Sequence, residues 1–313
     1  MDSKVKNSIA IGFSIICLLI AIYTYLFVKP PTILGFIPII LYSVLVMLGF
    51  VVLSTVAALL IIIVMTGQKP IDVAKLFADS LGAFITVVGL IIILGSGLGQ
   101  VARETGVVTT LVKWIIEKVG VKTQNRVQLG VMIASTTLVA LLGTLAGANA
   151  ILAPIVIPIV AALCFTPPAL AAMLHSAGAC GLFIGPFTPP VVTLTGTTGL
   201  SYTEYLMVAG IPMAATTWIV GFFMARWIQK KTYGKAAYEE AEALKQLPEP
   251  TKQSTKATYA FILTIAIMVI YGIYSKAPYS YAIVVMLTTS FITGLVGGKR
   301  PLEILQAIYR YFE

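Results

Sequence analysis

Charged residues are scarce in this sequence. Only 11% of its 313 residues are Asp, Glu, Lys or Arg, whereas 58% are hydrophobic, and the mean hydropathy is +0.98. Water-soluble domains usually contain about 25% charged residues. This composition therefore excludes an ordinary soluble enzyme.

Reactive and metal-binding motifs are also missing. The three cysteines, Cys17, Cys164 and Cys180, all lie inside apolar runs, and the sequence has no CxxC pair and no Cys/His spacing of a zinc site. It contains no Walker A motif, no GxSxG and no HExxH. We therefore expect a protein that is not an enzyme and that has no disulfide framework, no metal site and no cofactor.

Long apolar runs are what the sequence has instead. A helix needs about 20 residues to cross the roughly 30 Å hydrocarbon core of a bilayer. Runs of suitable composition cover residues 8–28, 33–65, 82–102, 127–163, 169–192, 205–228, 258–275 and 279–297. The run 33–65 fits either one long tilted span or two short ones. The first run is longer than the apolar part of a signal peptide, so we interpret it as a retained span. The sequence predicts an all-α polytopic protein of the lipid bilayer.

The basic residues indicate topology rather than nucleic-acid binding. The net charge is +9, but the Lys and Arg residues stand at the ends of apolar runs and not on one folded face. One basic cluster falls within 113–126 and another within 229–258, which also holds an acidic cluster at 239–242. The positive-inside rule places the cluster within 229–258 in the cytoplasm, and we expect the protein to lie in the inner (plasma) membrane. Residues 127–225, which separate the two clusters, contain no Lys or Arg, and if both clusters are cytoplasmic this segment crosses the membrane an even number of times.

Glycine and proline interrupt the apolar sequence between residues 143 and 199. Broken helices at membrane depth persist only where they pack inside protein or line a wet cavity. The first break candidate is Gly143–Pro154, where we predict a tight turn with Gly147 and Asn149 as ligands at its tip. Such a tip offers oxygens to Na⁺ and helix-end N–H groups to a carboxylate. Alternatively, Asn149 bonds a neighbouring helix.

The second break candidate is Gly185–Gly199. The adjacent Pro189 and Pro190 remove two backbone donors, so we predict that no helix runs through this segment. Hydroxyl groups can replace the hydration of an ion or a polar substrate without adding net charge. The predicted binding residues here are Thr188, Pro189, Thr193, Thr195 and Thr197. The alternative is an ordinary loop at the membrane surface.

Other polar residues within the apolar runs have weaker signals. His175 is the only histidine, and an intramembrane imidazole can relay a proton, although a packing role is the alternative. Ser135, Thr136 and Thr137 either line a pathway or bond to their own helix. Arg103 and Glu104 are expected to form a solvated pair at the end of a span.

A weak internal repeat relates two basic turns. Gly67–Ala74 and Gly298–Leu305 share glycine, a base, proline, an aliphatic residue, an acid and a second aliphatic in register, 231 residues apart. An odd number of spans between them would invert the second copy. We expect that the chain contains one repeat and only the start of a second. The predicted parts are N-terminal helices at 1–66, a first transport repeat at 67–228, a cytoplasmic loop at 229–257, a helix pair at 258–297 and the second repeat from 298–313.

These motifs together resemble the ion transporter superfamily of secondary carriers. Gly95–Gly106 and the run from His175 through Pro189-Pro190 to Gly210-Ile211-Pro212 are similar to gluconate permease-like proteins. The more distant divalent anion/sodium symporters have a Ser-Asn-Thr hairpin tip and a Thr-Pro-Pro break. Asn149, here flanked by two alanines, and Thr188-Pro189-Pro190 are similar to these. The resemblance implies two inverted repeats, each with a re-entrant hairpin and an unwound helix, and a dimer.

We therefore predict a secondary transporter that moves a small organic anion, gluconate-like or another carboxylate, with a proton or Na⁺. Two alternatives stay open at this point. One is a cation/proton antiporter, which would continue to move cations without any carboxylate. The other is a non-catalytic membrane subunit or fragment of a larger permease.

Overall fold

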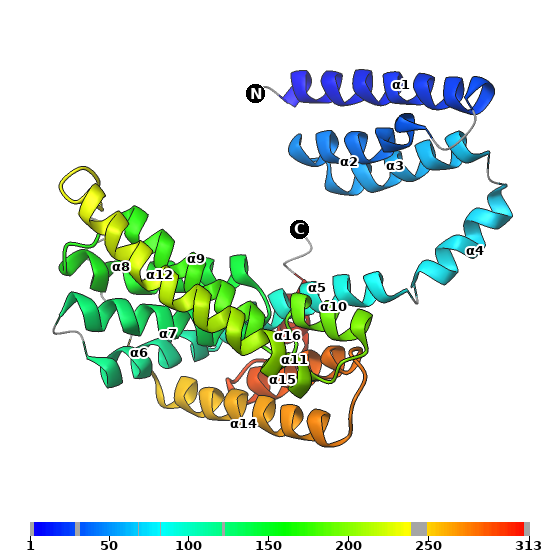
Figure 1. Ribbon diagram of the computed structural model, residues 1–313. Helices are drawn as coiled ribbons and strands as arrows, with labels where there is room; N and C mark the ends of the chain where they lie inside the picture. The colour runs from blue at the N-terminus through cyan, green and yellow to red at the C-terminus, as the bar shows by residue number, and fades with distance from the viewer. Residues whose placement is uncertain are drawn as a thin grey trace. The chain divides into compact units, whose positions relative to one another are not determined.

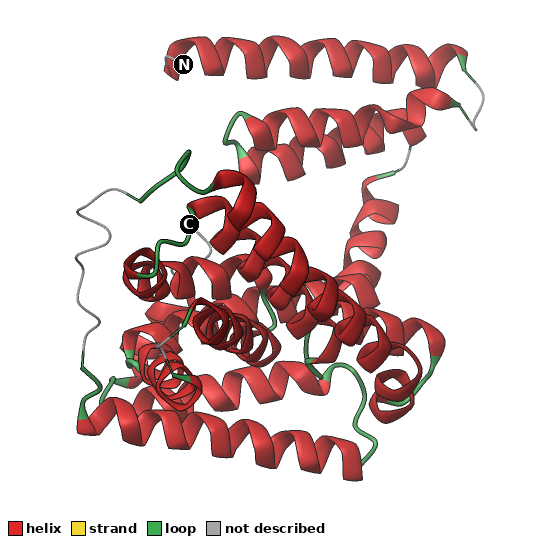
Figure 2. Ribbon diagram, turned by 60° about the vertical axis from the view of Figure 1, so that its left-hand side comes forward, coloured by secondary structure: helices red, strands yellow, loops and turns green. Residues whose placement is uncertain are grey.

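The computed structural model describes residues 3–28, 32–67, 69–81, 83–120, 123–238 and 249–309. Within this part of the chain, every regular element is a helix (Figure 2). Seven helical segments are long and apolar enough to cross a membrane, and three shorter apolar helices accompany them. The prediction of an all-α polytopic membrane protein is confirmed. The acidic cluster at 239–242 and the last four residues lie outside the described residues.

The chain divides into two compact units, Met1–Ala83 and Phe84–Glu313, coloured from blue to red along the chain in Figure 1. The helices of the first unit are α1 (Ser3–Phe27), η1 (Ile33–Phe36), α2 (Ile37–Met47), α3 (Val51–Thr66) and α4 (Pro70–Leu81). The run 33–65 thus forms two short helices. Gly49 lies between them with φ +89°, a conformation that favours glycine, and this explains why the run does not continue as one span.

The second unit is a helical bundle around a continuous apolar core. Its elements are α5 (Phe84–Glu104), α6 (Val107–Val119), α7 (Gln124–Leu142), α8 (Leu145–Ala162), α9 (Pro167–Ile184), α10 (Pro189–Thr198), α11 (Tyr202–Tyr205), η2 (Leu206–Gly210), α12 (Ile211–Thr232), α14 (Lys252–Tyr274), α15 (Tyr281–Val296) and α16 (Pro301–Tyr309). Helix α8 passes through Pro154 and Pro158 without interruption, so these two prolines do not break the fold.

The two basic clusters lie at one end of this bundle, which we call the basic end. The Lys113 ammonium is 2.7 Å from the Glu249 carboxylate, and Arg226 bonds Asn125, so the three chain segments meet there. Helices α7, α8, α9 and α12 connect the clusters along the chain. Four span-length segments return the chain to the same side, which agrees with the expected even number of crossings.

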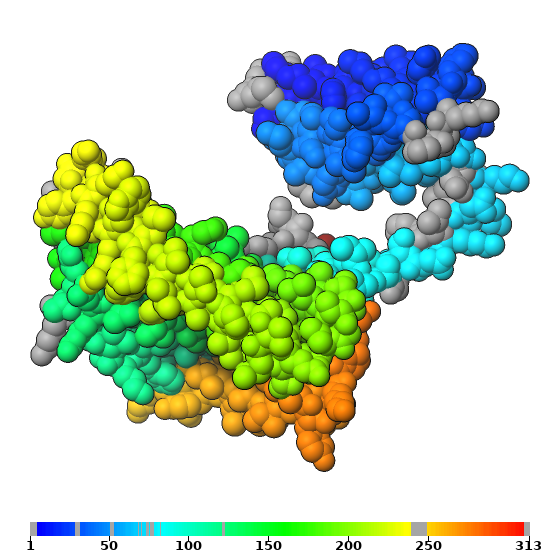
Figure 3. Space-filling model, in the orientation of Figure 1, coloured from blue at the N-terminus to red at the C-terminus, as the bar shows by residue number. Residues whose placement is uncertain are grey.

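Helices α7, α9 and α12 pack closely because small residues line their contacts. A methyl group added at Gly181 of α9 would lie only 2.5 Å from the Thr136 carbonyl oxygen of α7. On the other side of α9, the Cys180 thiol donates to the Ala214 carbonyl of α12. Close backbone approach of this kind is how helices associate in membranes. Figure 1 shows α12 running along α9, and Figure 3 shows it on the surface of the unit.

Candidate functional site

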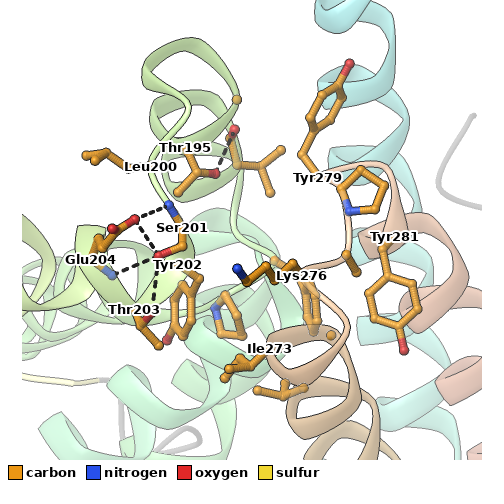
Figure 4. Close-up of a pocket in the computed structure, with 18 of the residues that line it drawn as sticks. Thr195, Leu200, Ser201, Tyr202, Thr203, Glu204, Ile273, Lys276, Tyr279 and Tyr281 are labelled. Atoms are coloured by element: carbon orange, nitrogen blue, oxygen red, sulfur yellow. Dashed lines mark hydrogen bonds between the residues drawn. The ribbon is translucent and has the colours of Figure 1, made fainter.

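A cavity of about 740 Å³ opens at the end of the second unit opposite to the basic end. Its walls come from three connections that are far apart in the chain: the α9–α10 break, the α10–α11 turn and the α14–α15 loop (Figure 4). Helix α14 begins at the basic end with Lys252, and its far end supplies Ile273 to the cavity. The volume is that of a small-molecule site.

The break that forms one wall has a local cause. Helix α9 ends at Ile184 and α10 begins at Pro189, because neither Pro189 nor Pro190 can donate a backbone hydrogen bond to α9. The Thr188 hydroxyl is buried and contacts the carbonyl oxygens of Leu182, at 2.6 Å, and Gly185, at 2.8 Å. The predicted break is present, and Thr188 stabilises it rather than facing the cavity.

The threonines after the break are not unwound, which corrects the prediction. Thr193, Thr195 and Thr197 belong to regular helix α10, because prolines at the first two positions of a helix start it rather than disrupt it. The Thr195 hydroxyl donates to the Val191 carbonyl at 2.8 Å, and that of Thr197 donates to the Thr193 carbonyl. Thr195 is the only residue of the predicted binding set that lines the cavity.

The first predicted turn is also displaced. The chain turns at Gly143, which has φ +71°, and Gly147 and Asn149 lie within α8 instead of at a tip. Thr144 caps α8, and its hydroxyl accepts from the Gly147 amide. Because Thr144 has extended backbone and its hydroxyl oxygen satisfies this free amide, α8 begins earlier than the Gly147–Asn149 pattern indicates.

Asn149 joins three helices at the centre of the bundle. Its carbonyl oxygen accepts from the Ser135 hydroxyl of α7 at 3.0 Å, and its amide donates to the Leu174 carbonyl of α9 at 3.0 Å. Ser135 itself also donates to Leu174, and Thr136 donates to the Ala177 carbonyl. Ser135 and Thr136 therefore bond to a neighbouring helix and not to their own. In this conformation Asn149 makes the interhelical bonds that the alternative interpretation described.

Two other residues, His175 and Glu104, have surroundings that differ from those predicted from the sequence. His175 is exposed on the outer face of α9 and is not among the residues that line the cavity. Glu104 does not form a solvated pair with Arg103. Its carboxylate lies 2.7 Å from the Lys299 ammonium, and Gln100 donates to it. The partner is remote in sequence, so the pattern around residue 104 could not indicate it.

The charged residues of the cavity were missed by the sequence interpretation. Lys276 follows α14, and Glu204 belongs to α11. Glu204 completes a capping box, since its carboxylate accepts from the amide of Ser201 at 2.8 Å and from its hydroxyl at 2.6 Å. Within the described part of the chain, the Lys276 ammonium makes no ion pair and no hydrogen bond. An isolated lysine between two apolar runs was the signal available in the sequence.

Comparison with known proteins identifies one family. A family model described as citrate transporter matches residues 42–308, from α2 to α16, and this stretch includes all residues that line the cavity. No curated protein and no solved structure matches the chain. The match supports a transporter family, but it does not support the more specific resemblance to gluconate permeases.

Proposed function

We propose, from the premise that the chain belongs to the citrate transporter family, that it carries citrate or a similar small carboxylate across the membrane, driven by a proton or Na⁺ gradient. Family membership makes the protein a membrane transporter and not an enzyme. The proposal rests on one observation above all: the family match spans the described helices of the bundle from α5 into α16, with its helix break and its cavity. We place it in the plasma (inner) membrane.

The inferred transport unit begins near residue 67 and a second, inverted copy begins near residue 298. Between Pro70 and Pro301 lie six of the seven long apolar segments, and the shorter apolar helix α15. Seven crossings are an odd number, so a second copy that starts at Pro301 is turned over in the membrane. Carriers built from inverted repeats bind their substrate between the copies, near discontinuous helices. The α9–α10 break is such a discontinuity.

The proposed binding residues have different tasks in this mechanism. Thr195 contacts the substrate from the cavity wall, and Thr193 and Thr197 offer their hydroxyls on the opposite face of α10. Thr188 and Pro189 form the joint at which α10 moves relative to α9. Gly147 and Asn149 bind the coupling ion after the hydrogen bond between Ser135 and Asn149 breaks, so that the Asn149 side-chain oxygen can contact the ion instead.

His175 is the proposed proton-coupling group if the driving ion is H⁺. Its exposure on α9 leaves the imidazole free to contact a second copy of the chain, and we propose a homodimer. Ionisable groups on transmembrane helices rarely face lipid.

Uptake by proteoliposomes tests the proposal. Labelled citrate, succinate and gluconate are offered to vesicles that contain only this chain, with an imposed proton or Na⁺ gradient. We expect gradient-driven uptake of at least one carboxylate and slower uptake by Thr195→Val. The matched control is Thr216→Val, because Thr216 is exposed on α12 and donates to the Pro212 carbonyl at the same 2.8 Å. No uptake of any carboxylate from folded protein would refute the proposal.

A further inference from the structure

We propose that Lys276 is the loading residue of the cavity: its ammonium group holds one carboxylate of an anionic substrate at the non-cytoplasmic end of the bundle. This inference rests on the proposed carboxylate transport and adds the group that first recognises the anion. Residues 127–225, which form most of the helices around the break, contain no Lys or Arg. Among the described residues that line the cavity, Lys276 is the only basic one.

Lys276 has an unusual backbone conformation at the end of α14. Lys276 has φ +49°, in the left-handed region that helix ends usually reserve for glycine. The Ala277 amide donates to the Gly272 carbonyl at 2.9 Å, which closes α14 at this residue, and Pro278 follows. A glycine here would cost less strain. The chain therefore keeps a lysine at a position where the backbone favours glycine.

The side chain extends from the α14–α15 loop toward the α10–α11 turn across the cavity (Figure 4). Both Lys276 and the facing Glu204 are exposed, so water and a dissolved anion can reach them. Glu204 is already bonded to Ser201, and no ion pair within 4.0 Å joins it to Lys276 in the described structure. The ammonium is thus available to an incoming carboxylate, while Glu204 repels the same anion.

This arrangement gives opposite predictions for the two charges. Loss of the ammonium weakens anion binding, and loss of the facing carboxylate strengthens it. Charge-assisted hydrogen bonds in partly exposed sites support an effect of about three- to ten-fold on the dissociation constant. Because the charges are exposed, high salt reduces the difference between the variants.

Binding of labelled citrate to the full chain in lipid nanodiscs tests the inference. Lys276→Gly removes the charge and relieves the backbone strain, so a misfolded variant is not the expected result. Glu204→Gln keeps a residue that completes the capping box. Lys276→Arg keeps the charge, and Lys252→Gln removes an exposed lysine at the opposite end of the same helix. Melting temperatures of all variants are measured in parallel.

We expect Lys276→Gly to bind citrate three- to ten-fold more weakly. Glu204→Gln should bind it more tightly, and Lys276→Arg and Lys252→Gln should bind it like the original chain. Equal binding by Lys276→Gly and the original chain overturns the inference, as does the absence of citrate binding by the original chain. Transport is measured separately: binding that depends on Lys276, without gradient-driven uptake, would retain the loading site and refute the proposed carrier function.

Discussion

The contact between α7 and α9 can be tested by adding one methyl group at Gly181. The new Cβ atom would lie 2.5 Å from the Thr136 carbonyl oxygen and 2.9 Å from the Ala140 nitrogen, both in the backbone of α7. Backbone atoms cannot rotate away, so the two helices must separate. Overpacking of this kind costs about 1–3 kcal/mol, and alanine in a helix interior recovers about 1 kcal/mol relative to glycine.

Gly130 provides the matched control within α7. It is buried and helical like Gly181, but a Cβ atom there would have its nearest neighbours at 3.7 Å, in ordinary contact. Gly130→Ala should therefore be neutral or up to about 1 kcal/mol stabilising. We expect Gly181→Ala to be less stable than Gly130→Ala by about 1–3 kcal/mol.

Thermal unfolding in detergent, followed by size-exclusion chromatography with fluorescence detection, ranks the two variants. A Gly181→Ala melting temperature at or above that of Gly130→Ala would refute the close α7–α9 packing. A second readout comes from α9 itself, because separated helices also break the Ser135–Leu174 bond. Uptake of the proposed carboxylate substrate by Gly181→Ala should therefore fall even in the fraction that remains folded.

Three further substitutions test hydrogen bonds that the fold requires. Gln229→Leu removes the acceptor of the buried Thr166 amide, which lies 2.9 Å from the Gln229 side-chain oxygen, and should lower the unfolding free energy by about 1–3 kcal/mol, as measured by thermal denaturation. Thr188→Val keeps the shape of the side chain but removes the hydroxyl donor that closes the helix break, so transport should slow. Thr188→Ser keeps this donor and should transport at the original rate. Initial uptake rates measure both effects. Asn149→Ala removes both interhelical bonds of that side chain and should cost about 1–3 kcal/mol, whereas a melting temperature like that of the original chain would exclude a structural role.

Features with local causes could be predicted from the sequence. The membrane spans follow from the apolar runs, and the α9–α10 break follows from Pro189 and Pro190, since each proline removes a donor from its own turn. The common location of the basic clusters follows from the positive-inside rule. Local signals also misled: the glycines around Asn149 indicated a turn there, but Gly143 adopts the left-handed conformation and Thr144 provides the cap.

Features that depend on remote residues could not be predicted. Lys276 and Thr195 are 81 positions apart in the sequence and face one cavity only because α14 returns to the end of the bundle where α10 lies. The Glu104–Lys299 pair joins the end of α5 to the turn before α16 in the same way. Their chemistry is visible in the sequence, but their partners are set by tertiary packing.

The order of the helices along the chain supports the weak repeat. Helices α4 and α16 both begin at the proline of the repeated motif, and each has an acid in its first turn, Asp72 and Glu303. Short turns of this composition are common, so similarity alone would not distinguish a repeat from coincidence. The proposed inversion requires an odd number of crossings between them, and the six long candidate spans and the shorter helix α15 that lie between them agree with this requirement. Two like helices that begin after opposite passages through the membrane are what an inverted-repeat carrier requires.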